Sequence, residues 1–356
     1  MNQSLDLKHI KNANAITTEK TIVYVNSLLD VWLLLILSSV GIVTNAMTIA
    51  VFRHQGWKEG VNISMTTIAL LDLIRCVLTI LKRIHGFIEL ISVADGVSWS
   101  NLTTPNAEFV NILTSYVSFA LLAYVSLERC LCVAMPFTMK TVFTPKRTLI
   151  ILIAIAAFVY LSLAVMCFNF SLDFVFSDEL NSTIIILVRS DFYNTHRGVV
   201  DPYLNSMSML VPTVSFIVLS VSSLILLRQL KTSRDAVSEN KTNEPVLNLP
   251  NHKTVKTTFR FSKREKQVTK MLLVVVSFYI GNLVPRVTWF VGQFVEPEFR
   301  ALGEFQDFYM MAVTLMFILD LVHASANFFI FYTMSSGFKR TFDQLMTCSS
   351  QTSLQQ

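Results

Sequence analysis

The sequence predicts an all-α membrane protein, a seven-transmembrane helix bundle with a short amphipathic helix after the last span. Of its 356 residues, 53% are hydrophobic and only 15% are charged, a balance that soluble domains rarely show. Seven apolar runs are long enough to cross about 30 Å of hydrocarbon. They make up a membrane domain over 29–335, and they lie near residues 29–53, 61–83, 106–135, 147–168, 202–228, 266–295 and 308–333.

Lysine and arginine are unevenly distributed between the segments that join these runs. The polar segment 229–263 between the fifth and sixth runs carries the largest group of basic residues, and the segments on the opposite side are acidic. Because basic loops stay in the cytoplasm, residues 1–28 are expected outside the cell and 336–356 inside. Residues 1–28 lack the apolar core of a signal peptide, so the first run is expected to act as its own signal anchor.

Asn-x-Ser/Thr triplets on the expected outer side predict sites of N-glycosylation. These sites are Asn2, Asn101, Asn169 and Asn181. Asn62 and Asn240 head similar triplets on the expected inner side and are expected to stay unmodified.

Polar side chains inside the apolar runs predict a site in the centre of the bundle, because lipid excludes them. Asp72 lies near the middle of the second run, and a buried unpaired carboxylate either takes up a proton or recruits a cation such as Na⁺. The residues expected in this core polar or ion site are Asn45, Asp72, Ser118, His323 and Asn327. The alternative is a hydrogen-bond network with a purely structural role. No other cofactor and no metal site is predicted.

The inner ends of the third and sixth runs predict a latch. Glu128 and Arg129 close the third run, where the membrane surface lets them pair locally. Glu265 begins the sixth run and is placed to reach Arg129, and Pro285 should kink that helix as Pro212 should kink the fifth. The alternative is that Glu265 only balances its basic neighbours.

Charged groups in the outer half of the bundle predict a ligand pocket. Arg75, Arg286 and Asp320 must face a cavity or one another. The expected pocket is lined by Asn111, Ser115, Arg286, Trp289 and Asp320 and recognises an anionic or amidated group. The alternative is an Arg286–Asp320 ion pair with no role in binding.

The segment after the last run predicts a helix in the plane of the inner membrane surface. Phe338, Phe342, Leu345 and Met346 share one face of it, and Cys348 beyond them is a candidate for palmitoylation. On the outer side, Cys167 is the one cysteine near the membrane surface, so no outer disulfide within the chain is expected.

Taken together, these motifs resemble those of rhodopsin-like G-protein-coupled receptors. The resemblance covers every run but the fourth and rests on Gly41…Asn45, Leu70…Asp72, Glu128-Arg129-Cys130 with Pro136, Pro212, Pro285, and Asn327-Phe328-Phe329-Ile330-Phe331 followed by Phe338. Within that family the chain looks like invertebrate FMRFamide-type peptide receptors and, more closely, molluscan chemosensory receptors. It departs from the family in Cys130, in Phe328 and in lacking the tryptophan of the sixth helix and the outer cysteine pair.

The resemblance implies a signalling receptor of the plasma membrane, not an enzyme. An extracellular neuropeptide or chemosensory cue would shift the bundle between two states, and outward movement of the sixth helix would expose Arg129 to a heterotrimeric G protein. Membrane lipid is the other expected partner, and no nucleic acid is. The absence of lysine from 308–333 argues against retinal, and Asn111 argues against a monoamine. The alternative function is a transporter or ion pathway that uses the intramembrane charges.

Overall fold

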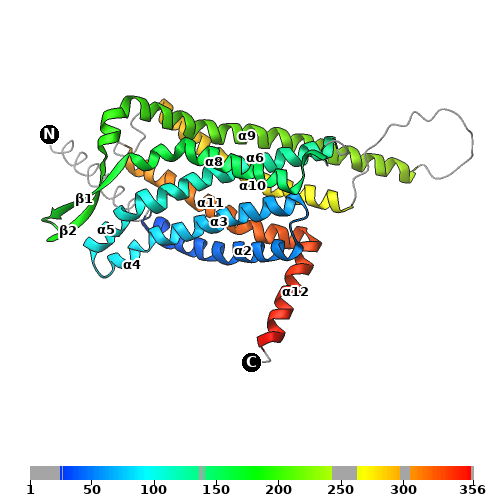
Figure 1. Cartoon of the computed structure of the whole chain (residues 1–356), viewed down its shortest axis with the longest axis horizontal. Helices are drawn as coiled ribbons and strands as arrows, with labels where there is room; N and C mark the ends of the chain where they lie inside the picture. Colours follow the sequence, from blue (N-terminus) through cyan, green and yellow to red (C-terminus); the bar gives the residue numbers. More distant parts are fainter. Residues whose placement is uncertain are drawn as a thin grey trace, which may run out of the picture.

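The computed structural model is an elongated bundle of long helices with a β-hairpin at one end and a transverse helix at the other (Figure 1). It describes residues 25, 27–135, 139, 141–242, 263–296 and 305–353, and within these it describes no side chains at 233–242, 263–266, 294, 306 and 348–353. Seven helical segments of this described part are long and apolar enough to span a membrane, which confirms the predicted fold class. They are Leu28–Gln55, Gly60–Glu89, Val93–Ala134, Pro145–Phe168, Asp191–Thr232, Gln267–Gln293 and Asp307–Met334.

The crossings contain more irregular helix than the sequence predicted. The first crossing consists of η1 (Leu28–Leu33) and α2 (Leu34–Gln55), and the second of α3 (Gly60–Arg83) and α4 (His85–Glu89). The third consists of α5 (Val93–Thr103), η2 (Thr104–Glu108) and α6 (Phe109–Ala134). The fourth consists of α8 (Pro145–Leu163) and η3 (Ala164–Phe168). The last three are α9 (Asp191–Thr242), α10 (Lys263–Val295) and α11 (Gln306–Met334), and α12 (Ser336–Ser353) follows.

Two helices extend well past the predicted runs. The third crossing begins at Val93 instead of near residue 106, because Ser92 caps a further helix by accepting a hydrogen bond from the Asp95 amide. The fifth crossing continues through Thr242, so the first part of the predicted polar loop 229–263 is helical. Hydropathy marks where a chain contacts lipid and does not mark where a polar helix begins or stops, so the start of the third crossing was placed too late and the end of the fifth too early.

Between α8 and α9 (η3 included with α8) the chain forms a β-hairpin, which the apolar runs do not predict. Strands β1 (Phe170–Ser177) and β2 (Ser182–Arg189) pair antiparallel, and Asn181 takes the left-handed conformation (φ 45°) that their turn requires. Aromatic and β-branched residues fill both strands and favour this structure.

Hydrogen bonds from α5 hold the hairpin on the bundle. The Asn101 side-chain amide donates to the Ile185 carbonyl oxygen (2.9 Å), and the Ile185 amide donates to Ser98 Oγ (3.1 Å). At the base of the hairpin, the Arg189 guanidinium lies over the ring of Phe170, 4.3 Å from its centroid. These contacts attach the hairpin without a disulfide, and the four cysteines whose side chains are described are free.

A group of aromatic rings joins α12 to the opposite end of the bundle, where α12 turns away from the long axis (Figure 1). The Phe338 ring is buried among those of Phe52, Phe331 and Phe328, at centroid distances of 5.4, 5.7 and 5.8 Å. Its neighbours Lys339 and Arg340 are exposed. Phe338 therefore docks α12 on the bundle while its basic neighbours stay outside, and the position of α12 in the plane of the inner membrane surface stays a prediction.

Replacing Phe338 by alanine should detach α12 and destabilise the protein by about 3 kcal/mol or more, because it empties a buried aromatic site. The measurement is the thermal unfolding of the purified chain in detergent. Met346→Ala on the same helix is the matched control, since Met346 is 52% exposed, and it should change stability by no more than about 0.5 kcal/mol. Equal unfolding temperatures for the two variants would contradict the docking role of Phe338.

Candidate functional site: a cavity above a buried charge network

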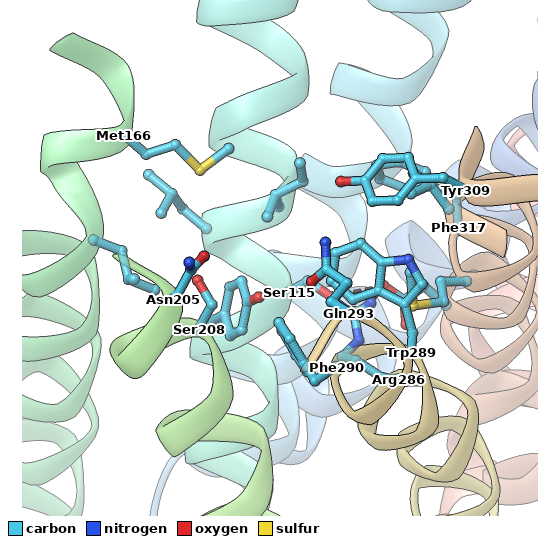
Figure 2. A pocket seen from close by; sticks show the side chains of 17 residues that line it. Ser115, Met166, Asn205, Ser208, Arg286, Trp289, Phe290, Gln293, Tyr309 and Phe317 are labelled. Atoms are coloured by element: carbon cyan, nitrogen blue, oxygen red, sulfur yellow. Dashed lines mark hydrogen bonds and ion pairs between the residues drawn. The ribbon is translucent and has the colours of Figure 1, made fainter. Parts of the chain in front are cut away.

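A cavity of about 250 Å³ lies in the hairpin half of the bundle, mainly between α6, α9, α10 and α11 (Figure 2). Its apolar wall is largely aromatic and includes Tyr116, Trp289, Phe290, Tyr309 and Phe317. Its polar groups are Ser115, Asn205, Ser208, Arg286, Gln293 and Asp320. An aromatic wall with a few convergent polar groups is typical of a site for a small organic ligand, although 250 Å³ is below the usual range of roughly 300–1,000 Å³.

Four of the five residues predicted for the ligand pocket line this cavity: Ser115, Arg286, Trp289 and Asp320. The fifth, Asn111, is buried outside the lining and donates a hydrogen bond to Thr79 Oγ1 (2.9 Å). Asn111 therefore joins α6 to α3 in this structure. The sequence placed it one helical turn from Ser115, on the same side of the helix, but could not show that a partner on α3 takes its amide.

The carboxylate of Asp320 connects the cavity to four neighbouring polar groups. Asp320 Oδ1 accepts from the Asn282 amide (2.7 Å), and Oδ2 accepts from Ser115 Oγ (2.6 Å). Oδ2 also pairs with Arg286 Nη2 (3.0 Å) and with Arg75 Nη2 (2.7 Å). Asp320 is only 1% exposed, so these contacts replace the water that a charge would otherwise bind. One α11 carboxylate thus binds α3, α6 and α10.

Arg75 continues the network toward the middle of the bundle. Its Nη1 lies 3.6 Å from Asp72 Oδ1, one turn earlier on α3, and Asp72 Oδ2 accepts from the Asn327 amide (3.2 Å). The Arg286–Asp320 ion pair that was the alternative to a ligand pocket is therefore present, but Asp320 also pairs with a second guanidinium, that of Arg75. The order along the network is Arg286, Asp320, Arg75, Asp72, Asn327.

The predicted core polar set is brought together only in part. Asp72 and Asn327 are in contact, whereas Asn45 donates to the carbonyl oxygens of Gly41 (2.9 Å) and Ala324 (3.2 Å). Ser118 is fully buried on α6. The His323 ring packs against Tyr279, with centroids 3.7 Å apart.

A sodium ion beside Asp72 does not fit these contacts. One carboxylate oxygen faces the Arg75 guanidinium and the other accepts from Asn327, so the charge that Na⁺ would neutralise is already paired. In the described part of the chain, no group of three or more His, Cys, Asp or Glu side chains could hold a metal ion.

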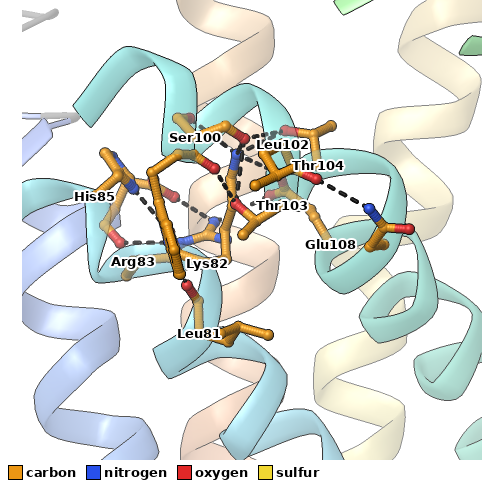
Figure 3. A network of polar contacts seen from close by, with 12 residues as sticks. Leu81, Lys82, Arg83, His85, Ser100, Leu102, Thr103, Thr104 and Glu108 are labelled. Atoms are coloured by element: carbon orange, nitrogen blue, oxygen red, sulfur yellow. Dashed lines mark hydrogen bonds and ion pairs between the residues drawn. The ribbon is translucent and has the colours of Figure 1, made fainter. Parts of the chain in front are cut away.

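A second buried charge cluster lies at the hairpin end, where α3 ends beside η2 (Figure 3). Lys82 Nζ donates to Thr104 Oγ1 (2.6 Å) and lies 3.5 Å from Glu108 Oε2. Arg83 Nη2 pairs with Asp30 Oδ1 (2.7 Å) and Glu108 Oε1 (3.1 Å). The cluster thus balances two cations with two anions.

Sequence reasoning did not single out this cluster, although a signal was present. Lys82 and Arg83 are adjacent basic residues at the end of a run that should point outward, against the usual distribution of positive charge. Such a pair needs acidic partners nearby. The Arg83 guanidinium also lies 5.2 Å from the centroid of the Phe317 ring, and Phe317 lines the cavity.

At the α12 end, Arg129 pairs with its neighbour Glu128, which is buried, while the Arg129 side chain keeps 20% of its surface exposed. The side chain of Glu265 lies outside the described residues, so the predicted Arg129–Glu265 latch stays a prediction. Two residues after Glu265, the structure shows a different link. Gln267 Nε2 of α10 donates to the Met334 carbonyl oxygen at the end of α11 (2.6 Å).

The predicted hinges and glycosylation sites differ in their surroundings. Pro212 and Pro285 both lie inside long helices, α9 and α10.

Among the glycosylation triplets, Asn181 is exposed at the hairpin turn, Asn169 is buried, and Asn101 uses its amide to hold Ile185. Asn2 lies outside the described residues.

A comparison with known protein families finds a match over most of the chain. Residues 32–349 match the family model described as serpentine type 7TM GPCR chemoreceptor Srw. This match covers the first spanning segment from Trp32 onward, the other six in full, the cavity and both charge clusters except Asp30. No curated protein matches the chain.

Replacing Asp320 by asparagine should destabilise the protein by about 3–5 kcal/mol, because two buried guanidinium groups lose the carboxylate that they share. Thermal unfolding in detergent measures the effect. Asp343→Asn on α12 is the control, since Asp343 is exposed and its loss should cost no more than about 0.5 kcal/mol. An Asp320→Asn protein as stable as the wild type would show that the network contributes little to the bundle.

Proposed function

We propose that this chain, which belongs to the Srw family of serpentine seven-transmembrane GPCR chemoreceptors, binds an extracellular chemical ligand and activates a heterotrimeric G protein. The observation that carries the proposal is the cavity in the hairpin half, with the shared carboxylate of Asp320 at its boundary. A ligand in that cavity would contact the group on which α3, α6, α10 and α11 converge. Binding at such a point can change the relative stability of two helix arrangements.

The lining favours a small ligand with an anionic or amide group. Arg286, Ser115 and Gln293 supply polar groups at the cavity, and the buried Arg286 Nε makes no hydrogen bond to the described residues. A carboxylate or carbonyl oxygen is the natural acceptor for a guanidinium. Trp289 and Tyr309, with ring centroids 5.3 Å apart, offer a surface for an apolar or aromatic body. The volume suits a small cue or the end of a peptide better than a whole peptide.

The proposed receptor lies in the plasma membrane with its hairpin end outside and its α12 end in the cytoplasm. Basic residues at the α12 end support this orientation, among them Arg53, Arg147, Lys339 and Arg340. The docked amphipathic α12 suits the inner surface of the membrane. Lipid is then the second partner of the chain.

Signalling in this proposal depends on α10. Arg286 follows Pro285, the residue at which α10 lacks a backbone donor, and Gln267 ties the other end of α10 to α11. Ligand contact at Arg286 would shift the inner half of α10 away from α11, and this movement would make Arg129 accessible to the G protein.

The Arg286→Ala variant tests the ligand site. Cells that express the chain with a promiscuous G protein are screened for calcium release with small carboxylates, amides and amidated peptides. For any active compound, Arg286→Ala should raise the half-maximal concentration by about 10- to 100-fold, because the substitution removes a charge-assisted hydrogen bond to the ligand.

Arg197→Ala is the matched control, since Arg197 is 68% exposed outside the cavity lining and should respond as the wild type does. Cell-surface levels of all three proteins are measured with an antibody to an epitope tag. An unchanged response of Arg286→Ala at equal surface level would exclude the site. Ligand-driven uptake or current without nucleotide exchange on a G protein would instead support the transporter alternative.

Asn181→Gln tests the orientation. If the hairpin lies outside the cell, Asn181 is the triplet most open to the glycosylation machinery, and its replacement should remove a glycan and increase gel mobility. Asn62→Gln at the α12 end should leave the mobility unchanged. If Asn62→Gln instead removed a glycan, the α12 end would lie outside the cell, and the proposed topology would be reversed.

A further inference from the structure

The middle of the bundle holds two carboxylates and two guanidinium groups in one connected row. Arg75 lies between the two acids, with Nη1 3.6 Å from Asp72 and Nη2 2.7 Å from Asp320. Arg286 completes the row from α10, 3.0 Å from Asp320. All four side chains are buried, and their formal charges sum to zero.

The contacts of Asp72 show where its neutralising charge comes from. One of its oxygens accepts from Asn327 and the other faces Arg75, which is fixed to the same helix one turn away. A free cation approaching Asp72 would have to displace this guanidinium. Arg75 cannot leave for water, because its side chain is only 4% exposed and its other nitrogen is bound to Asp320.

Electrostatics also opposes an additional ion. Asp72 and Asn327 do not line the cavity, so Na⁺ beside them would be enclosed. With the four charges already balanced, it would leave a net positive charge in an environment of low dielectric constant, where unpaired charge is costly. The buried Asn327 Oδ1 makes no hydrogen bond to the described residues. Neutral water can satisfy this oxygen without changing the charge of the site, whereas a cation cannot.

We propose that Arg75 is the resident cation of this core site, a covalently attached guanidinium that takes the place of a free Na⁺ beside Asp72. The protein should therefore be insensitive to sodium. The same guanidinium holds Asp320 at the cavity, so the charge state around Asp72 is linked directly to the cavity by one side chain.

The first test measures the wild-type chain without any ligand. Thermal unfolding of the purified full-length protein in detergent is compared in NaCl, KCl and choline chloride at one ionic strength of about 0.15 M, which keeps general screening equal. The unfolding temperature should be the same in the three salts. A temperature that is selectively higher in NaCl would overturn the proposal.

Removing the cation should create the sodium site that the wild type lacks. Arg75→Gln leaves Asp72 unpaired and the row with one net negative charge. Its unfolding temperature should fall in choline chloride, and NaCl should restore roughly 2–4 °C of the loss. An Arg75→Gln protein that folds and gains no stability in NaCl would show that Arg75 does not stand in for an ion.

Two further variants serve as controls. Asp72→Asn added to Arg75→Gln leaves the neutral Asp320–Arg286 pair, and the double variant should lose the sodium response. Arg75→Lys keeps a cation in place and should stay insensitive to sodium. If Arg75→Gln does not fold, Arg75→Lys takes its place in the test. A sodium-selective gain in the stability of Arg75→Lys would also contradict the proposal. Because neither ligand nor G protein is needed, these results are independent of the proposed receptor function.

Discussion

The negative charge of Asp320 has to be neutralised inside the bundle, and the way this is done determines how four helices meet. Burying a carboxylate without partners is prohibitive in a low-dielectric interior. Here Arg75 from α3, Ser115 from α6, and Asn282 and Arg286 from α10 all supply donors to it. These donors restrict the rotation of each helix about its axis, because a rotation by one residue, about 100°, would carry a donor away from Asp320. The position of Asp320 at the edge of the cavity is therefore fixed by its charged and polar partners.

The same requirement operates at the hairpin end, where it replaces a covalent link. Lys82 and Arg83 can be buried there only because Asp30 and Glu108 face them from η1 and η2. This pairing ties α3 to the start of α6. The hydrogen bonds from α5 to Ile185 then hold the hairpin above it. The ion pairs and hydrogen bonds together restrain the region that a disulfide between the third helix and the hairpin would otherwise restrain.

How far the sequence alone could go follows from what each kind of pattern encodes. Apolar runs fix the number of crossings, and the spacing of Phe338 and Phe342 fixes the docking face of α12, because both depend on local composition. Polar residues such as Arg286 and Asp320 predict a cavity, since lipid excludes them. Partner choice is different. Whether Arg75 meets Asp72, Asp320 or both depends on how α3 and α11 are rotated against each other, which no local pattern encodes. The hairpin and the added helix at Val93 do have local signals, the β-forming residues of the two strands and the Ser92 cap, but hydropathy does not report them.

The position of Arg286 explains how a small ligand could produce a large effect in the proposed receptor. Pro285 precedes it and leaves α10 without one backbone hydrogen bond, so the helix bends more easily there than elsewhere. Gln267, near the other end of α10, lies 18 residues before Pro285, which corresponds to about 27 Å of helix. A tilt of about 10° at the proline would move that end by roughly 5 Å, enough to break its hydrogen bond to the Met334 carbonyl. A ligand therefore does not need to reach the cytoplasmic end. It needs only to change the pairing of Arg286 with Asp320, beside the point where the helix is weakest.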